Sequence, residues 1–345
     1  MKKLITSSIL FLMAFSSFAC STFLLSKDGR LVFGRNYDWV SGNGIVVVNA
    51  RGVTKTSFVG EGEKAVTWTS KCGSISFNQF GKEFPHGAMN EKGLVVDLMW
   101  LEGTVYPNAD SRGALNELQW IQYQLDNSAS VQEVIASHKA IRISQKDAVP
   151  LHYLVADAMG NAATIEFIKG EMVVHQDKEL PFPVLTNTPY AEALGEVKAQ
   201  RVGGDNSIER FAKACNMVQT FAQSTTKEDP VDYAFSILDN VAQGDFTKWR
   251  IVYDITNREI YFLTAGKRKQ VSLNEFDYSC SKPSLYIDIN SNKIGKVSAD
   301  FALLSFDQNK RILQQSAVES KSHVTVSDES VNRGADYFRR MKCAQ

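Results

Sequence analysis

The order of the predicted secondary-structure elements limits the fold of this chain more than any other feature. Apolar runs of strand length come first, helical patterns follow, and both kinds of segment then return. We expect strands within 21–39, 44–48, 58–77, 94–100, 151–176, 249–254, 259–264 and 270–273, helices over 114–125 and 131–139, from 207 and from 229, and a short helix ending the polar tail 310–345. A parallel sheet would need strands and helices in alternation. The block order predicts an α+β fold with largely antiparallel sheets.

Short polar signals mark where several of these elements begin or turn. Lys27-Asp28-Gly29 separates two apolar runs and predicts a hairpin turn. Ser207 is the expected N-cap of one helix, and Asp229-Pro230 fits the N-cap and first position of the next. Cys215 lies on the apolar stripe of the first of these helices, which favours a core thiol over a ligand.

The N-terminus has the pattern of a secretory leader. Lys2 and Lys3 precede a short apolar run over 4–15, and Ser17-Phe18-Ala19 places small residues before a cleavage point. The run is shorter than the ~20 residues that span a bilayer, so we expect no stable membrane insertion. The prediction is a signal peptide over 1–19, removed after Ala19, and one domain over 20–345. Such a protein is exported, to the periplasm or out of the cell.

Composition narrows the classes of function. The 38 basic and 38 acidic residues balance, which argues against nucleic-acid binding. The five cysteines contain no C-x-x-C pair, so a structural zinc site is not indicated, and we expect no metal and no cofactor. An odd cysteine in an exported chain suggests one reactive or buried thiol. Pairing among Cys72, Cys215, Cys280 and Cys343 is open.

Cys20 would be the first residue after cleavage. Its thiol would then share one residue with a free α-amine, whose ordinary pKa of about 7.7–8.0 leaves part of it neutral near pH 7. A neutral amine can accept the thiol proton, so nucleophile and general base lie together and no histidine is needed. One alternative is lipidation of Cys20, although Ser17 and Phe18 occupy positions where that processing prefers a leucine-like and a small residue. Another is an incidental cysteine.

Arg35 and Asp38 follow Cys20 along the predicted hairpin. A turn near Asp28 would return both side chains close to the start of the first strand. A guanidinium beside a thiol favours the thiolate, and a carboxylate can orient an α-amine. The alternative is an ordinary surface Arg–Asp pair.

Five short motifs occur in the order seen in a known family. They are Cys20-Ser21-Thr22, Phe33-Gly34-Arg35-Asn36-Tyr37-Asp38, Met89-Asn90-Glu91-Lys92-Gly93-Leu94, Leu185-Thr186-Asn187-Thr188-Pro189 and Glu209-Arg210-Phe211. With a cysteine at the cleavage point, this ordered set resembles the choloylglycine hydrolases, which include bile salt hydrolases and penicillin V acylases. These are N-terminal nucleophile hydrolases. The resemblance extends to about Leu273 and implies a four-layer αββα fold and cleavage of a linear amide.

The resemblance also implies roles for individual residues. Cys20 would be the nucleophile, Arg35 would lie beside the thiol and Asp38 would hold the α-amine. Asn187 would donate its side-chain amide to the oxyanion, and Arg210 would complete the polar network. Without the family, Asn187 is a turn residue and Arg210 a solvated charge in the first turn of a helix.

Two positions depart from the family pattern. Where bile-salt-specific members have an asparagine, this chain has Trp100. By the resemblance, Trp100 would place its indole against the substrate and offer its backbone N–H to the oxyanion. The alternative is a core tryptophan. The 22 residues between Asn187 and Arg210 are fewer than in many members, whose longer loop helps to build a tetramer. The family therefore implies a homo-oligomer, but this short loop disfavours tetramer assembly through it.

Cys72-Gly73-Ser74 partly matches the nucleophile signature of papain-type proteases, but the second cysteine and the aromatic residue are missing. We therefore expect an exported amidase that uses Cys20 and forms an acyl-thioester. Glycine- or taurine-conjugated bile salts are the first choice of substrate, with penicillin V and N-acyl homoserine lactones as alternatives. A non-catalytic, lipid-anchored envelope protein of the same fold is the alternative from another class.

Overall fold

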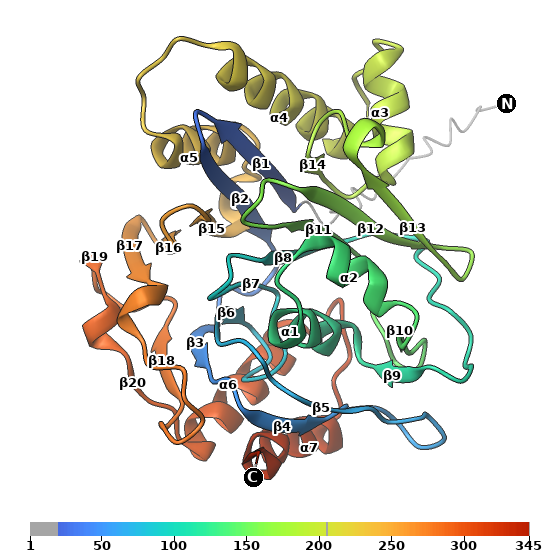
Figure 1. Cartoon of the computed structure of the whole chain (residues 1–345), viewed down its shortest axis with the longest axis vertical. Coiled ribbons are helices and arrows are strands. Elements are labelled where there is room, and N and C mark those ends of the chain that lie inside the picture. The colour runs from blue at the N-terminus through green and yellow to red at the C-terminus, as the bar shows by residue number, and fades with distance from the viewer. Residues whose placement is uncertain (1–19, 205, 345) are drawn as a thin grey trace, which may run out of the picture.

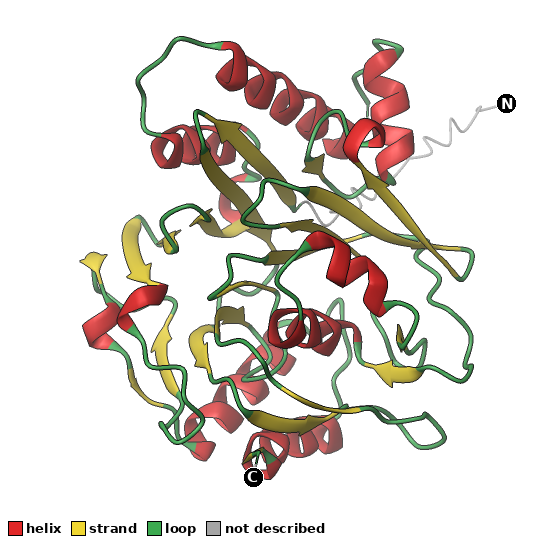
Figure 2. Ribbon diagram, in the orientation of Figure 1, coloured by secondary structure: helices red, strands yellow, loops and turns green. Residues whose placement is uncertain are grey.

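The computed structural model describes residues 20–204 and 206–344, so the predicted leader over 1–19 lies outside the described residues. Two large β-sheets lie face to face between helical layers (Figures 1 and 2). This is the predicted α+β sandwich of mainly antiparallel sheets. The single domain over 20–345 stays a prediction.

The first sheet has seven strands among the described residues, in the order β14-β1-β2-β15-β16-β17-β19. Neighbouring strands are antiparallel except β17 and β19. The bounds are β1 (Ser21–Lys27), β2 (Arg30–Asp38), β14 (Val184–Leu185), β15 (Thr247–Asp254), β16 (Glu259–Thr264), β17 (Lys267–Ser272) and β19 (Gly295–Lys296). The predicted hairpin over 21–39 is confirmed, with its turn at Asp28 and Gly29.

The second sheet has nine described strands in the order β13-β12-β11-β8-β7-β6-β3-β18-β20, and its neighbours are antiparallel. The bounds are β3 (Ile45–Asn49), β6 (Ser74–Asn78), β7 (Gly87–Asn90), β8 (Val95–Trp100), β11 (Leu151–Ala156), β12 (Ala162–Ile168), β13 (Glu171–Gln176), β18 (Leu285–Asp288) and β20 (Ala302–Leu303). Strand β8 lies between β11 and β7, which confirms the central strand predicted over 94–100.

Helices cover the outer faces of both sheets (Figure 1). Helices α4 (Asn206–Gln223) and α5 (Pro230–Asn240) pack on β1 and β2, with α3 (Tyr190–Lys198) beside α4. Helix α1 (Glu117–Asn127) packs on β7 and β8, next to α2 (Val131–Ser137). Smaller sheets join β9 (Gly113–Leu115) to β10 (Ile141–Ile143), and β4 (Val53–Thr56) to β5 (Thr67–Thr69) and β21 (Lys342–Cys343).

Three predictions about helices need correction. Ala114 and Leu115 belong to β9, and α1 begins after Asn116, whose side chain caps the amides of the next turn. Ser207 lies inside α4, which begins at Asn206, and its hydroxyl bonds to the segment carrying Asn187. The tail contains two full helices, α6 (Phe306–Glu319) and α7 (Asp328–Arg340), where one short helix was expected. The N-cap at Asp229 and Pro230 at the first helical position are confirmed.

The core between the sheets is aromatic. The ring of Phe77, from the second sheet, lies 5.4 Å from that of Phe262 and 6.0 Å from that of Tyr253, both from the first. Strand β2 is buried from Leu31 to Asp38 because sheet neighbours flank it and side chains cover both faces. Its polar residues must therefore find partners inside the protein.

The hairpin depends on a close approach at Gly34. Gly34 pairs with Phe23, and a Cβ added there would lie 2.3 Å from Cζ of the Phe23 ring. We expect Gly34→Ala to lower the free energy of unfolding by about 1–3 kcal/mol, because the ring has to move in a packed core.

Gly195 is the matched control, since an added Cβ there meets no atom within 4 Å and the residue lies in α3. Gly195→Ala should raise the free energy of unfolding by about 0.5–1 kcal/mol. Urea denaturation measures both variants, and a Gly34→Ala protein as stable as the parent would contradict the packing argument.

Candidate active site

Cys20 lies immediately before β1 and is 5% exposed. Its thiol donates a hydrogen bond to the Asp38 carbonyl over 3.9 Å. The hairpin register pairs Ser21 with Asn36 and Thr22 with Arg35. The return of Arg35 and Asp38 to the start of the first strand is therefore confirmed as geometry.

The Arg35 side chain is fully buried and connects the two sheets. Its guanidinium pairs with Asp97 on β8 over 2.7 Å and donates to the carbonyls of His86 and Leu98 over 2.7 and 3.3 Å. Its carbon centre also lies 4.9 Å from the ring centroid of Tyr37. The alternative of a surface Arg–Asp pair is thus wrong for Arg35.

Asp38 is buried at the end of β2. Its Oδ1 accepts a hydrogen bond from the Thr247 hydroxyl, whereas its Oδ2 has no hydrogen-bond partner within residues 20–204 and 206–344. Burial raises the pKa of Asp38 to about 6, although the Thr247 hydroxyl and the charges of Arg210 and Arg35 act in the opposite direction. A buried carboxylate oxygen without a donor is a strong acceptor for any cation placed beside it.

Arg210 brings the α4 helix to the start of β1. Its Nη1 donates to the Cys20 carbonyl over 2.6 Å and to the Ser21 hydroxyl over 2.8 Å. Its Nη2 donates to Oδ1 of Asn187 over 3.0 Å. Arg210 is 3% exposed, so the alternative of a solvated charge is wrong.

Asn187 points its amide toward the end of β8. Because Arg210 holds the oxygen of that amide, its nitrogen is turned away from Arg210, and this Nδ2 donates to the Trp100 carbonyl over 2.7 Å. The backbone N–H of Asn187 donates to the Ser207 hydroxyl over 2.9 Å. The structure therefore brings Cys20, Asn187 and Arg210 together, with Trp100 next to them.

A buried polar pair behind Asn187 was not found by the sequence analysis. His152 on β11 places Nε2 2.7 Å from the Thr186 carbonyl and Nδ1 3.1 Å from Oε1 of Glu166, which also accepts the Tyr190 N–H over 3.0 Å. A carbonyl only accepts, so Nε2 is the donor in the contact with Thr186. The sequence signal that could have indicated this pair is a polar residue, His152 or Glu166, inside each of two apolar strand patterns.

The electrostatics of Cys20 differ from the expected thiolate. Burial raises the pKa of the thiol, and this effect outweighs the lowering by the Arg35 and Arg210 charges. The nearby Asp38 carboxylate also raises it. The buried thiol therefore keeps its proton at neutral pH and needs a base before it can attack.

His86 does not fit the role of that base. Its ring lies 5.5 Å from the Tyr37 ring, and burial together with the Arg35 charge lowers its pKa to about 3. A group with so low a pKa binds a proton poorly at neutral pH.

A cavity of about 250 Å³ opens from Cys20. Trp39 and Trp100 line it with ring centroids 6.1 Å apart, and three phenylalanines, Phe58, Phe80 and Phe84, line it further on. Trp100 is half-buried, so the structure supports its placement against the cavity rather than as a core residue.

The remaining cysteines lie elsewhere. Cys280 and Cys343 form a disulfide, while Cys72 and Cys215 are buried free thiols. Cys215 lies on α4 and faces the core, as predicted, and burial raises its pKa. Among residues 20–204 and 206–344, no cluster of three metal-binding side chains occurs, and no helix is long and apolar enough to span a membrane.

Two stacked, mainly antiparallel sheets between helices form the fold of the N-terminal nucleophile hydrolases. The family described as linear amide C–N hydrolases, choloylglycine hydrolase family, matches residues 20–194. The chain belongs to this family and is a hydrolase of linear amide C–N bonds.

Individual relatives agree with this assignment. The chain is 28% identical over 256 residues to a penicillin V acylase of Pectobacterium atrosepticum, covering 60% of this chain and 67% of that one. A penicillin V acylase structure from Agrobacterium tumefaciens has a TM-score of 0.72 at 24% identity, covering 83% of this chain and 98% of that one. A mutant conjugated bile acid hydrolase from Clostridium perfringens has a TM-score of 0.67 at 17% identity, covering 80% and 98%. The two structures show the same fold.

The raised pKa of Asp38 predicts that the stability of the folded state depends on pH. The ordinary pKa of 3.8 applies in the unfolded chain, so between about pH 4 and pH 6 the folded state holds a proton that the unfolded state has lost. The free energy of unfolding therefore falls as the pH rises through this window. Asp38→Asn removes the titration, and its gain in unfolding free energy over the parent should be larger at pH 7 than at pH 4, by up to about 3 kcal/mol.

Urea denaturation of the full chain, in which the Cys20 nitrogen is part of a peptide bond, measures this difference. The same gain at both pH values would show that Asp38 is not held with a raised pKa.

Proposed function

We propose that this protein is an exported acylase in which Cys20, freed by cleavage after Ala19, attacks the carbonyl carbon of an N-acyl amide. The observation that carries the proposal is the buried Oδ2 of Asp38, which has no hydrogen-bond partner among the described residues and belongs to the residue whose backbone carbonyl accepts the Cys20 thiol. Cleavage after Ala19 would create an α-amine at Cys20. That amine is the donor which this oxygen lacks.

The reaction follows from the protonation states. The neutral α-amine accepts the proton of the Cys20 thiol, and Sγ then forms a bond to the carbonyl carbon. The resulting oxyanion takes a hydrogen bond from the Asn187 amide, whose orientation Arg210 fixes through Oδ1. The C–N bond breaks as the ammonium returns its proton to the leaving amine. Water then hydrolyses the acyl-thioester, releases the acid and restores the thiol.

Trp100 offers a second donor to the oxyanion. The Leu101 N–H donates to the Pro150 carbonyl on the β11 side, so the N–H of Trp100 points to the other side of the strand, because successive amides alternate. The Trp100 carbonyl on that side accepts from Asn187. The two proposed donors therefore face the same region.

The dimensions of the cavity favour a small aromatic acyl group. Its volume of about 250 Å³ lies below the ~300–1,000 Å³ usual for ligand pockets, and tryptophan and phenylalanine rings line it. The phenoxyacetyl group of penicillin V has one ring on a short linker, whereas a bile acid has four fused rings. We therefore rank penicillin V before conjugated bile salts, which the sequence alone placed first. The named activity of the Pectobacterium relative supports the same order.

Cys20→Ala should abolish amide hydrolysis, because no other described group offers a thiol to the cavity. Cys72→Ala and Cys215→Ala are matched controls that remove the other two described free thiols and should retain activity. Intact mass of the parent during turnover should show an added acyl group. Activity in Cys20→Ala, or a mature chain whose Cys20 carries a diacylglyceryl group, would contradict the proposal; the latter would favour the lipid-anchored alternative.

The substrate order is tested by kcat/KM for penicillin V, glycocholate, taurocholate and an N-acyl homoserine lactone. We expect penicillin V to lead by roughly tenfold or more, since discrimination by pocket size reaches about 10- to 200-fold. A preference for either bile salt would restore the first choice from the sequence and overturn the argument from cavity volume.

A further inference from the structure

One wall of the cavity comes from the C-terminal arm, which we define as residues 305–344. Leu313 on α6, the connection 324–326, and Ser330, Arg333 and Gly334 on α7 line the same cavity as Cys20. This arm lies outside residues 20–194, the part that matches the family. Figure 1 shows α6 and α7 in red, with α7 next to β4 and away from α4 and α5.

The arm is anchored to the residues that form the other walls. Trp39 donates from Nε1 to the Ser320 hydroxyl over 2.9 Å. The Tyr337 ring lies 6.1 Å from that of Phe84, and the Arg333 guanidinium lies 4.8 Å from the centroid of Phe58. Trp39, Phe58 and Phe84 all line the cavity. A change in the arm would therefore also shift the side chains that form the other walls.

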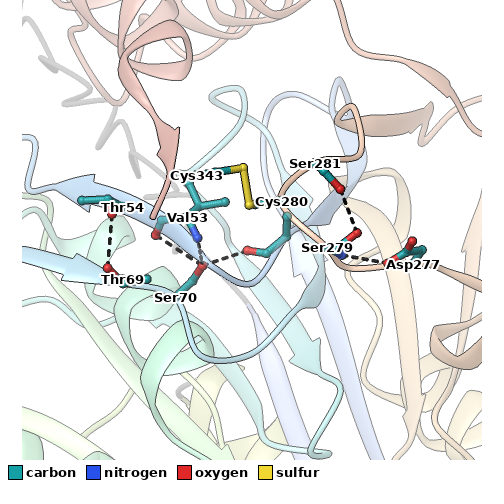
Figure 3. The surroundings of a disulfide bond; sticks show 10 residues. Val53, Thr54, Thr69, Ser70, Asp277, Ser279, Cys280, Ser281 and Cys343 are labelled. Atoms are coloured by element: carbon teal, nitrogen blue, oxygen red, sulfur yellow. Dashed lines mark hydrogen bonds between the residues drawn. A yellow bond between two sulfur atoms is a disulfide. The ribbon is translucent and has the colours of Figure 1, made fainter. Parts of the chain in front are cut away.

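A covalent bond fixes the far end of α7. Cys343 in β21 pairs with Val53 in β4 and forms the disulfide to Cys280, with 5.5 Å between the Cα atoms (Figure 3). The Ala344 N–H also donates to the Gly52 carbonyl over 2.8 Å. Helix α7 therefore cannot move away from the cavity as a unit while these connections hold.

Gly334 is the position where α7 leaves room. A Cβ built there would lie 3.6 Å from Cδ2 of Leu313 and 3.7 Å from Cε2 of Phe84, both ordinary contact distances. All three residues line the cavity, so a methyl group fits but a longer side chain has to occupy cavity space. Gly334 is buried within a helix, where a larger residue is compatible with the backbone.

We infer that the C-terminal arm is the specificity wall of the acyl pocket, and that the missing side chain at Gly334 sets the largest acyl group admitted. This inference rests on the proposed acylase function of Cys20. It assigns the acyl portion of the substrate, a compact aromatic group, to the space between α7 and the phenylalanine side chains. The disulfide holds this wall in place.

Gly334→Leu tests the inference with two amides of one amine, penicillin V and its N-acetyl analogue. We expect KM for penicillin V to rise by roughly tenfold or more, because the leucine side chain competes for the acyl space, while kcat/KM for the acetyl analogue changes by less than about twofold. Gly334→Ala should fall between the parent and Gly334→Leu. Asn332→Leu, at an exposed position of the same helix, is the matched control and should leave both substrates unchanged.

Val324→Ala provides the opposite change if Gly334→Leu does not fold. It removes side-chain volume from the wall and should raise kcat/KM for glycocholate relative to penicillin V by about threefold or more. Cys343→Ser should shift this ratio in the same direction, because it releases the end of α7.

The outcomes separate the two proposals. A parent enzyme without activity on any amide would remove the proposed function itself. An active parent, with Gly334→Leu affecting both acyl groups equally and Val324→Ala leaving the substrate ratio unchanged, would overturn only the role of the arm.

Discussion

The buried ion pair between Arg35 and Asp97 is the contact on which the rest of the site depends. It joins β2 of one sheet to β8 of the other, and neither side chain is exposed. An unpaired buried guanidinium is costly, so the two sheets have to meet where this charge is compensated. Gly87 leaves space for the carboxylate, since an added Cβ would lie 2.1 Å from Oδ2 of Asp97. Cys20 is one residue from the strand pair that this contact fixes.

Burial holds the Cys20 thiol protonated, so the thiol needs a base before it can attack. Burial outweighs two nearby arginines and holds the thiol protonated, while the neighbouring Asp38 retains an oxygen without a donor among the described residues. Both features are unfavourable in isolation, and in the proposed mechanism a terminal amine at Cys20 would donate a hydrogen bond to that Asp38 oxygen. In the proposed mechanism the amine and the thiol of Cys20 supply base and nucleophile, so it assigns no role as base to His86, which lines the cavity and has a pKa lowered to about 3.

Catalytic groups and pocket walls come from different parts of the chain. The proposed reacting groups lie on the hairpin, on the segment around Asn187 and on α4, whereas the C-terminal arm closes the other side of the cavity. Substitutions in the arm can therefore change the acyl group that is admitted while the chemistry stays the same.

Local features could be predicted from the amino-acid sequence. Turn residues predicted the hairpin, and its register followed from the turn, so local signals alone were enough to bring Arg35 and Asp38 near Cys20. The buried state of Arg210, its bond to the Cys20 carbonyl across 190 positions and the pairing of Cys280 with Cys343 were decided only by tertiary structure. The physical reason is range: a turn is set by the dihedral preferences of a few residues, whereas burial, cavity volume and the balance of charges depend on segments that packing alone brings together.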